Sequence, residues 1–300
     1  MSSFLPDQIA AAVPSVAALT RSPKVQAGVA ALAVLGTLSQ LNEWLSRRKT
    51  NNFLTDKSWD WSKEIVVVTG GSSGIGATIV EKLQHRGIKI IVLDINKPSK
   101  EFGKNTSFYQ VDLSDALATA SVADRICHDH GDPTVLVNNA GIGHGTSILS
   151  TSEATLQRCF GINLFAPYRL IQQFLPAMVR RNHGHIVNVG SMASFTTQVL
   201  NVDYGMTKSG VLALHEGLKQ ELLHIYNAPA VRATVVHPSW VRTPMAEAMI
   251  KTNKLPGAYV TADDVAGAIT RQLFSGYGAQ IVVPDSGWWI SMMRGLPIWI

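Results

Sequence analysis

Three polar residues, Ser191, Tyr204 and Lys208, have the types and spacing needed for proton transfer. Tyr204 and Lys208 are four residues apart in a segment with helical spacing, so both side chains would project from one helix face. A phenol has a pKa of about 10, and a neighbouring ammonium group lowers it toward the neutral range. Ser191 follows an apolar run, 185–190, interpreted as a buried strand. At the carboxyl end of that strand its hydroxyl could hold a substrate oxygen. The alternative is an ordinary helix surface.

A glycine-rich turn between an apolar run and a helical segment predicts a pyrophosphate-binding site. Residues 64–69 form a β-branched run typical of a buried parallel strand, and residues 77–86 have helical spacing. Glycines let the backbone approach the phosphates, and the N–H groups of the helix N-terminus favour the anion. A tight turn without a ligand is the alternative. The predicted cofactor-binding residues of this turn are Gly70, Ser72, Ser73, Gly74, Ile75 and Gly76.

Asp94 ends the next predicted strand and favours NAD over NADP as the cofactor. An acidic residue about 20 positions after the glycine turn accepts hydrogen bonds from the adenosine-ribose hydroxyls and repels a 2′-phosphate. Neither arginine nor lysine occurs at Ser72, Ser73 or Ile95. Lys97 is close in sequence and is interpreted as a solvated loop charge.

Three further polar residues are candidates for the same site. Asp112 follows the third strand and could either cap the next helix or accept from the adenine amino group; we favour the second role because Ser114 can cap the helix. Asn139 belongs to an Asn-Asn-Ala-Gly run that would let the cofactor lie against the sheet edge, with a simple turn as the alternative. Asn163 lies in one long helical pattern, 156–181, where it is either a structural hydrogen-bonding residue or the holder of a relay water.

The C-terminal third of the chain supplies the remaining candidates. Val241 and Thr243 follow the sixth predicted strand, where they could bond the nicotinamide carboxamide. Residues 245–259 are apolar and irregular, which suggests a flexible lid over an apolar substrate. The tail, 286–300, is rich in tryptophan and is predicted to contact a membrane surface or another subunit.

An apolar segment near the N-terminus, residues 25–41, has features of membrane segments. Arg21 and Lys24 precede it, and Trp44 and the basic run 47–49 follow it. Its strictly apolar core is shorter than the roughly 20 residues of a clean span. Three interpretations remain: a single-pass or hairpin anchor, an interfacial helix, or a soluble helix packed on a partner or on the domain. If the segment spans, the basic run would keep the catalytic domain in the cytosol.

Composition excludes several classes of protein. The 300 residues, 46% hydrophobic and 16% charged, suffice for one large α/β domain with an appendage. Basic residues are scattered apart from the run 47–49, so no nucleic-acid partner is expected despite the net charge of +5. Cys127 and Cys159 are isolated, and His183 and His185 lack a third ligand at metal spacing. No metal site is therefore expected.

Taken in order, these motifs resemble the classical short-chain dehydrogenase/reductase family. The resemblance covers roughly residues 64–283. It implies a doubly wound, Rossmann-type α/β domain with a seven-stranded parallel sheet. It also implies a catalytic tetrad of Asn163, Ser191, Tyr204 and Lys208, with the tyrosine and lysine also contacting the cofactor. One departure is Ser239 after Pro238, where the family usually has glycine.

A finer resemblance is to the membrane-associated branch that includes retinol and hydroxysteroid dehydrogenases, carried by residues 93–97 and 181–187. It implies an N-terminal anchor, a location at the endoplasmic reticulum or lipid droplets, and retinoid, steroid or fatty-alcohol substrates. A homodimer is also expected. We predict hydride transfer between NAD(H) and a lipophilic alcohol, ketone or aldehyde. The alternatives are an NADPH-dependent carbonyl reductase and a non-catalytic nucleotide-binding scaffold at a membrane. The expected divisions are an anchor and linker, a dehydrogenase domain and a tail: 1–55, 56–285 and 286–300.

Overall fold

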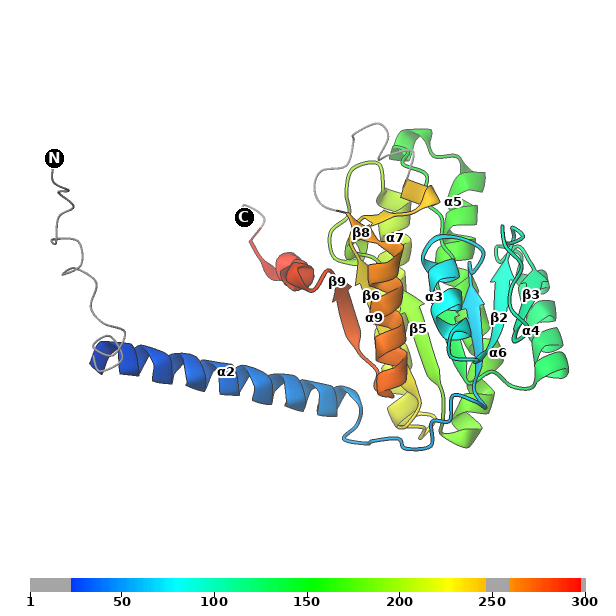
Figure 1. Ribbon diagram of the computed structural model, residues 1–300. Helices are drawn as coiled ribbons and strands as arrows, with labels where there is room; N and C mark the ends of the chain where they lie inside the picture. The colour runs from blue at the N-terminus through cyan, green and yellow to red at the C-terminus, as the bar shows by residue number, and fades with distance from the viewer. Residues whose placement is uncertain (1–22, 247–258, 298–300) are drawn as a thin grey trace, which may run out of the picture. The chain divides into compact units, whose positions relative to one another are not determined.

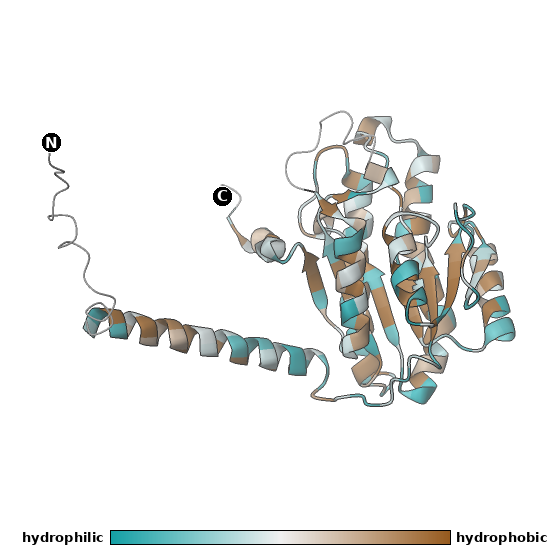
Figure 2. Cartoon of the chain, viewed as in Figure 1, coloured by the Kyte–Doolittle hydropathy of each residue, from teal (hydrophilic) through white to brown (hydrophobic). Residues whose placement is uncertain are grey.

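The computed structural model describes residues 23–246 and 259–297, which fall into two units, residues 1–49 and residues 50–300. The first unit contains helix α2 (Pro23–Thr50), which reaches the unit boundary. None of the 28 residues of α2 is buried, and the helix is long and apolar enough to cross a membrane, by length and composition alone. Figure 2 shows its apolar residues gathered toward the N-terminal half, and its last turn carries Arg47, Arg48 and Lys49.

The second unit is built on a seven-stranded sheet in the order β3-β2-β1-β4-β5-β6-β9, in which every pair is parallel (Figure 1). The predicted seven-stranded parallel fold is confirmed. The inner strands are runs of valine, isoleucine and leucine because helices cover both faces of the sheet. The strands are β1 (Ile65–Thr69), β2 (Lys89–Asp94), β3 (Thr106–Gln110), β4 (Val135–Asn138), β5 (His185–Val189), β6 (Arg232–Pro238) and β9 (Gln280–Val283).

Two apolar clusters pack the helices onto the sheet. One face is covered by α3 (Gly74–Gln84) and α9 (Ala262–Ser275), whose buried side chains meet Val66 and Val68 of β1. The opposite face meets Val67 and carries three long helices, α4 (Ala116–His130), α6 (Ala166–Arg181) and α7 (Val202–His224). The shorter elements are η1 (Ile148–Ser150), α5 (Glu153–Phe160), η2 (Gly161–Phe165), η3 (Met192–Ser194), β7 (Val241–Arg242), β8 (Val260–Thr261) and η4 (Asp285–Gly295).

The strand order places a crevice at the carboxyl ends of the central strands. The chain runs outward from β1 to β2 and β3, then returns to the other side of β1 as β4. The loops after β1 and β4 therefore diverge, and such a reversal is where open α/β sheets bind ligands.

Two details differ from the expectations. The long pattern 156–181 is not one regular helix, because a π-helical segment, η2, separates α5 from α6. The first unit also ends before residue 55. Asn51 is buried in the second unit, where its side chain exchanges hydrogen bonds with the backbone of Gly278. Residues 50–55 thus belong with the catalytic domain rather than with a linker.

Candidate functional site

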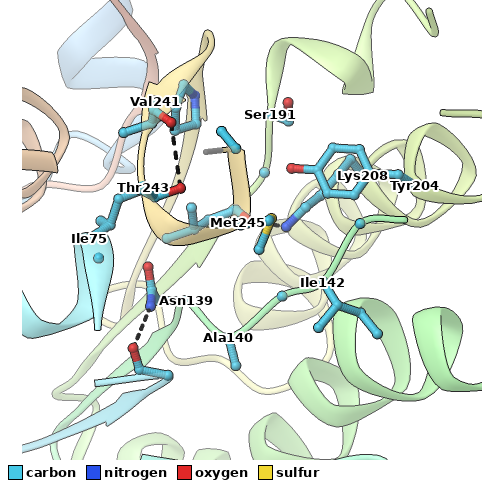
Figure 3. Close-up of a pocket in the computed structure, with 18 of the residues that line it drawn as sticks. Ile75, Asn139, Ala140, Ile142, Ser191, Tyr204, Lys208, Val241, Thr243 and Met245 are labelled. Atoms are coloured by element: carbon cyan, nitrogen blue, oxygen red, sulfur yellow. Dashed lines mark hydrogen bonds between the residues drawn. The ribbon is translucent and has the colours of Figure 1, made fainter. Parts of the chain in front are cut away.

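A cavity of about 690 Å³ opens at the carboxyl ends of the strands. Figure 3 shows Ser191, Tyr204 and Lys208 on one side of it and Ile75 and Asn139 on the other. Most of the residues predicted from sequence line this one cavity: Gly70, Ser73, Gly74, Ile75, Asp94, Asp112, Asn139, Ser191, Tyr204, Lys208, Val241 and Thr243. Three predicted residues, Ser72, Gly76 and Asn163, are not among its lining.

The turn after β1 needs glycine for conformation and for space. Gly70 and Gly74 have positive φ angles of 65° and 55°, a region that favours glycine. A Cβ on Gly70 would lie 2.9 Å from the Cα of Ala140, and one on Gly76 would collide with the carbonyl oxygen of Gly70. The backbone is therefore bare where helix α3 begins, and Gly74 and Ile75 of its first turn line the cavity. This cradle fits a dinucleotide pyrophosphate.

Asp94 is held by the backbone on both of its carboxylate oxygens. The N–H of Ser72 donates to Oδ2 at 3.0 Å, and the N–H of Asn96 donates to Oδ1 at 2.9 Å. The Ser72 hydroxyl turns away from the cavity and donates to the carbonyl of Asn96 at 2.7 Å. Each carboxylate oxygen keeps further acceptor capacity, so Asp94 can still accept from a ribose hydroxyl.

Asp112 makes different contacts from those expected. Its Oδ1 accepts from both the N–H and the hydroxyl of Ser114, at 2.9 and 2.7 Å. Helix α4 is instead capped by Asp115, which accepts from two N–H groups of the first turn, so the expectation that Ser114 caps it was wrong. Burial opposes ionisation of Asp112, but the Ser114 bonds and the Arg158 guanidinium, 3.3 Å from Oδ2, lower the pKa of the carboxyl. Arg158 also lines the cavity and was not predicted.

Asn139 acts as a brace between the two diverging loops. Its side-chain amide donates to the carbonyls of Thr69 and Gly70, at 3.0 and 3.2 Å. In return, the Thr69 hydroxyl accepts from the N–H groups of Asn139 and Ala140, each at 2.9 Å. The loops after β1 and β4 are therefore fixed against each other on the cavity floor.

Asn163 lies in the π-helical segment, a feature often found at functional sites. Its Oδ1 accepts from the N–H of Ile142 at 2.8 Å, and its amide donates to the carbonyl of Ile142 at 2.9 Å and to Thr207 at 3.1 Å. A Cβ built on Gly141 would lie 3.5 Å from both Asn163 Oδ1 and Lys208 Nζ. Asn163 and Lys208 therefore lie on either side of Gly141, and Asn163 does not line the cavity.

Lys208 is buried and Tyr204 is half-buried at the cavity wall, and this changes their acid–base behaviour. Burial raises the pKa of the Tyr204 phenol, while a side-chain hydrogen bond with Ser191 acts in the opposite direction. Burial lowers the pKa of Lys208 to about 8. The Lys208 ammonium lies 5.5 Å from the centre of the Tyr204 ring. The expected lowering of the tyrosine pKa by the lysine is not the dominant effect here, because desolvation acts more strongly on both groups.

Thr243 and Val241 lie on the far side of the cavity from Tyr204 (Figure 3). A Cβ on Gly74 would come 3.4 Å from Cγ2 of Thr243, so this residue covers the start of α3. Met245 also lines the cavity. Residues 247–258 of the expected lid, with Met249, Ile250 and Leu255, lie outside the described residues.

The tail contributes to the cavity wall, which the sequence did not indicate. Gly287, Trp289 and Ile290 of η4 line it. Arg294 fixes the far end of η4, because its guanidinium donates to the carbonyl of Phe195 at 2.8 Å and to the Ser209 hydroxyl at 3.1 Å. Of the tryptophans that suggested a membrane or subunit contact, Trp289 lines the cavity and Trp288 does not, and Trp299 lies outside the described residues.

The described geometry defines a class of protein, a Rossmann-type oxidoreductase with a tyrosine and a lysine at its site. Comparison with known proteins makes this definite. A model of the short chain dehydrogenase family matches residues 64–254. The chain belongs to the short-chain dehydrogenase family and is an NAD(P)-dependent oxidoreductase of the alcohol-dehydrogenase type.

Two curated relatives and one solved structure illustrate the similarity. Dehydrogenase RED2 of Cochliobolus heterostrophus is 43% identical over 201 residues, which are 66% of this chain and 76% of that protein. Estradiol 17-beta-dehydrogenase 11 of Mus musculus is 29% identical over 199 residues, 64% of this chain and 66% of that protein. A short-chain dehydrogenase from Streptomyces avermitilis has the same fold, with a TM-score of 0.67 and 24% identity, over 77% of this chain and 92% of that chain. The resemblance to hydroxysteroid dehydrogenases is confirmed at the level of sequence.

Proposed function

We propose that this protein transfers a hydride between NAD(H) and a lipophilic alcohol, ketone or aldehyde while attached to a membrane. One observation carries the proposal: the glycine cradle, Asp94, Ser191, Tyr204 and Lys208 all face one cavity of about 690 Å³. A cofactor site and a proton-transfer pair therefore share a single cavity, as a hydride transfer coupled to a proton transfer requires.

The chain's own residues supply the proton chemistry. When bound, the nicotinamide exchanges the hydride with the carbon that carries the substrate oxygen. In the oxidative direction Tyr204 takes the hydroxyl proton, and Ser191 holds the substrate oxygen within reach of the phenol. Lys208 stabilises the resulting phenolate. Asn163 keeps the loop after β4 in place through Ile142 and supports a water relay behind the lysine.

The choice of NAD over NADP is supported by the surroundings of Asp94. This carboxylate is buried at the cavity edge, anchored by two backbone N–H groups. A 2′-phosphate placed against it would bring two negative charges together in a poorly hydrated position, whereas ribose hydroxyls can donate to it.

A lipophilic substrate is supported by the wall around Tyr204 and Ser191. The side chains that complete the cavity there are mostly large and apolar: Ile142, Met192, Trp240, Met245, Trp289 and Ile290. Burying an apolar ligand against them would supply binding energy of roughly 25 cal/mol per Å². The similarity to estradiol 17-beta-dehydrogenase 11, whose name denotes a steroid substrate, agrees with this class.

Membrane attachment is supported by α2. Its side chains are exposed along its length, and the last turn is basic. A basic run on the catalytic-domain side of a span favours a cytosolic domain. The resemblance to the membrane-associated branch supports a location at the endoplasmic reticulum or at lipid droplets.

The test is a fluorescence titration of the full chain, purified in detergent, with NADH and with NADPH. We expect tighter binding of NADH, by roughly tenfold or more, and loss of that preference in Asp94→Ser. Oxidation of long-chain or sterol alcohols should then fall by roughly 10²- to 10⁴-fold in Tyr204→Phe. Preferential binding of NADPH by the wild type would instead indicate a carbonyl reductase. Turnover unaffected by Tyr204→Phe would contradict the mechanism and leave a nucleotide-binding scaffold.

A further inference from the structure

Three metal-ligating side chains from separate elements meet beside Tyr204. His144 lies in the loop after β4, Cys159 in the last turn of α5, and Asp203 in the first turn of α7. None of the three lines the cavity described above. The residues are far apart in sequence, which is why motif spacing predicted no metal site here.

The cluster is compact and mostly buried. One potential ligand atom from each residue lies within 4.8 Å of the other two. Nδ1 of His144 is 3.5 Å from Oδ2 of Asp203. Cys159 is 0% exposed and Asp203 is 6% exposed. The three groups therefore already converge on one small volume.

Asp203 supplies an independent sign that the volume receives a ligand. Its Oδ2 is buried and makes no hydrogen bond among the residues that the structure describes, although His144 Nδ1 lies 3.5 Å away. A buried carboxylate oxygen without a partner is costly, and native proteins satisfy such atoms with water, an ion or another group. The unpartnered oxygen faces His144 and the cysteine, so a ligand bound there would satisfy it.

We propose that His144, Cys159 and Asp203 form a binding site for a divalent cation of the zinc class. Thiolate, imidazole and carboxylate together suit zinc or cobalt rather than calcium or magnesium, which prefer oxygen ligands. Bond lengths of about 2.0–2.3 Å from a tetrahedral metal place ligand atoms about 3.3–3.8 Å apart, so side-chain shifts of about 1 Å complete the site. On binding, the Cys159 thiol releases its proton to solvent, and the cation neutralises two negative charges. Water takes the fourth position.

The site is accessible and connected to the active site. The His144 side chain is 26% exposed, which gives a cation a way in. The Asn163 amide donates to Cys159 Sγ at 3.5 Å, an outer contact of the kind that orients metal ligands. Asp203 precedes Tyr204 in α7, and a Cβ on Gly143 would lie 3.4 Å from the tyrosine ring. A bound cation would therefore link the loop after β4 to the first turn of α7, one residue before Tyr204.

The experiment uses Co²⁺ as the probe, added to the untagged full chain in detergent under reducing conditions. We expect a thiolate-to-cobalt charge-transfer band that saturates at one equivalent and is displaced by Zn²⁺. Cys159→Ser should abolish the band. Cys127→Ser is the matched control, since Cys127 lies outside the cluster, and it should leave the band unchanged. His144→Ala, a change in a partly exposed loop, should weaken Co²⁺ binding by at least about tenfold.

The proposal is overturned if the wild type gives no charge-transfer band, or if the band is lost in Cys127→Ser and kept in Cys159→Ser. Circular dichroism and thermal melting check that each variant is folded. If Cys159→Ser does not fold, His144→Ala and Asp203→Asn decide: unchanged cobalt affinity in both refutes the site. Because the readout is spectroscopic, failure of this test leaves the proposed dehydrogenase activity untouched.

Discussion

The Lys208 ammonium donates a 2.8 Å hydrogen bond to the carbonyl oxygen of Val189, the last residue of β5. This bond links the N-terminal half of helix α7 to the carboxyl end of strand β5, two residues before Ser191. It fixes the lysine where it borders both the tyrosine ring and Gly141. The lysine therefore has a structural partner in addition to its proposed role toward Tyr204.

Replacing this lysine should reduce turnover and stability together. Lys208→Met leaves the buried Val189 carbonyl unpaired and removes the only positive charge proposed to stabilise the phenolate. We expect turnover to fall by roughly 10²-fold or more and the free energy of unfolding to fall by about 1–3 kcal/mol. Steady-state kinetics and thermal melting measure the two effects.

Lys219→Met is the matched control for this change. Lys219 lies on the same helix, is partly buried, and is not part of the cavity lining. Wild-type kinetics are expected. Equal loss of turnover in both variants would show that the effect of Lys208→Met reflects damage to α7 rather than the loss of a group at the site.

The tail offers a prediction about substrate binding. Trp289 lines the cavity, while its neighbour Trp288 is 60% exposed and does not. Trp289→Ala should raise KM for bulky apolar alcohols by roughly tenfold with little change in kcat, because apolar contact is lost in ground state and transition state alike. Kinetics with a short and a long alcohol measure the difference, which should be small for the short one. Trp288→Ala should leave both unchanged; an equal rise in KM would place the tail's effect outside the cavity.

Local chemistry explains why so much of the sheet could be predicted from the sequence. Buried parallel strands are β-branched runs, and each ends at a turn signal, so Asp94 and Ser191 were correctly placed at strand ends. The cofactor turn was recognisable because its glycines are needed within a few residues of one another. These features each depend on a short segment of sequence, so the local pattern is enough to predict the local structure.

Other features depend on contacts between distant segments. Trp289 reaches the cavity only because β9 pairs with β6 at the sheet edge. The π-helical segment around Asn163 inserts one extra residue per turn, which a helical periodicity does not distinguish. The pKa values of Tyr204 and Lys208 depend on burial, which spacing alone does not give. The sequence motif therefore identified Tyr204 and Lys208, but it gave no information about how burial shifts their pKa values.

An ionic cluster at the opposite end of the sheet predicts a pH dependence of stability. His183 lies 3.1 Å from Asp56 and 3.3 Å from Glu64, atom to atom, and the bond with Glu64 raises the pKa of His183 above its usual value. The pKa values of Glu64 and Asp56 are lowered, because their hydrogen bonds outweigh burial. The histidine's contribution is thus complete below its unfolded pKa of about 6.5 and is lost as pH rises through its higher folded pKa. The carboxylates' contribution is lost as pH falls below about 4.

His183→Gln should therefore destabilise the protein most between about pH 5 and 6.5. We expect a loss of about 1–2 kcal/mol there, shrinking by pH 9, measured by denaturant unfolding across the pH range. Lys63→Gln is the control, since Lys63 pairs with Asp60 in an exposed position nearby and should have little effect at any pH. A destabilisation by His183→Gln that does not vary with pH would mean that shape, and not charge, matters at this position.

The boundary between the two units predicts that two truncated proteins, differing by only six residues, will differ in stability. Arg232 is 2% exposed and donates to the carbonyls of Asn51 and Leu54, at 3.2 and 3.1 Å. Removal of residues 1–49 keeps these partners and should release the protein from membranes with its kinetic constants unchanged. Removal of residues 1–55 strips a buried guanidinium of two acceptors and should cost about 3 kcal/mol or more. Flotation with liposomes measures attachment, and urea unfolding measures stability. Equal stability of the two truncated proteins would show that residues 50–55 are a linker. Membrane binding by the protein that lacks residues 1–49 would show that the anchor is not α2.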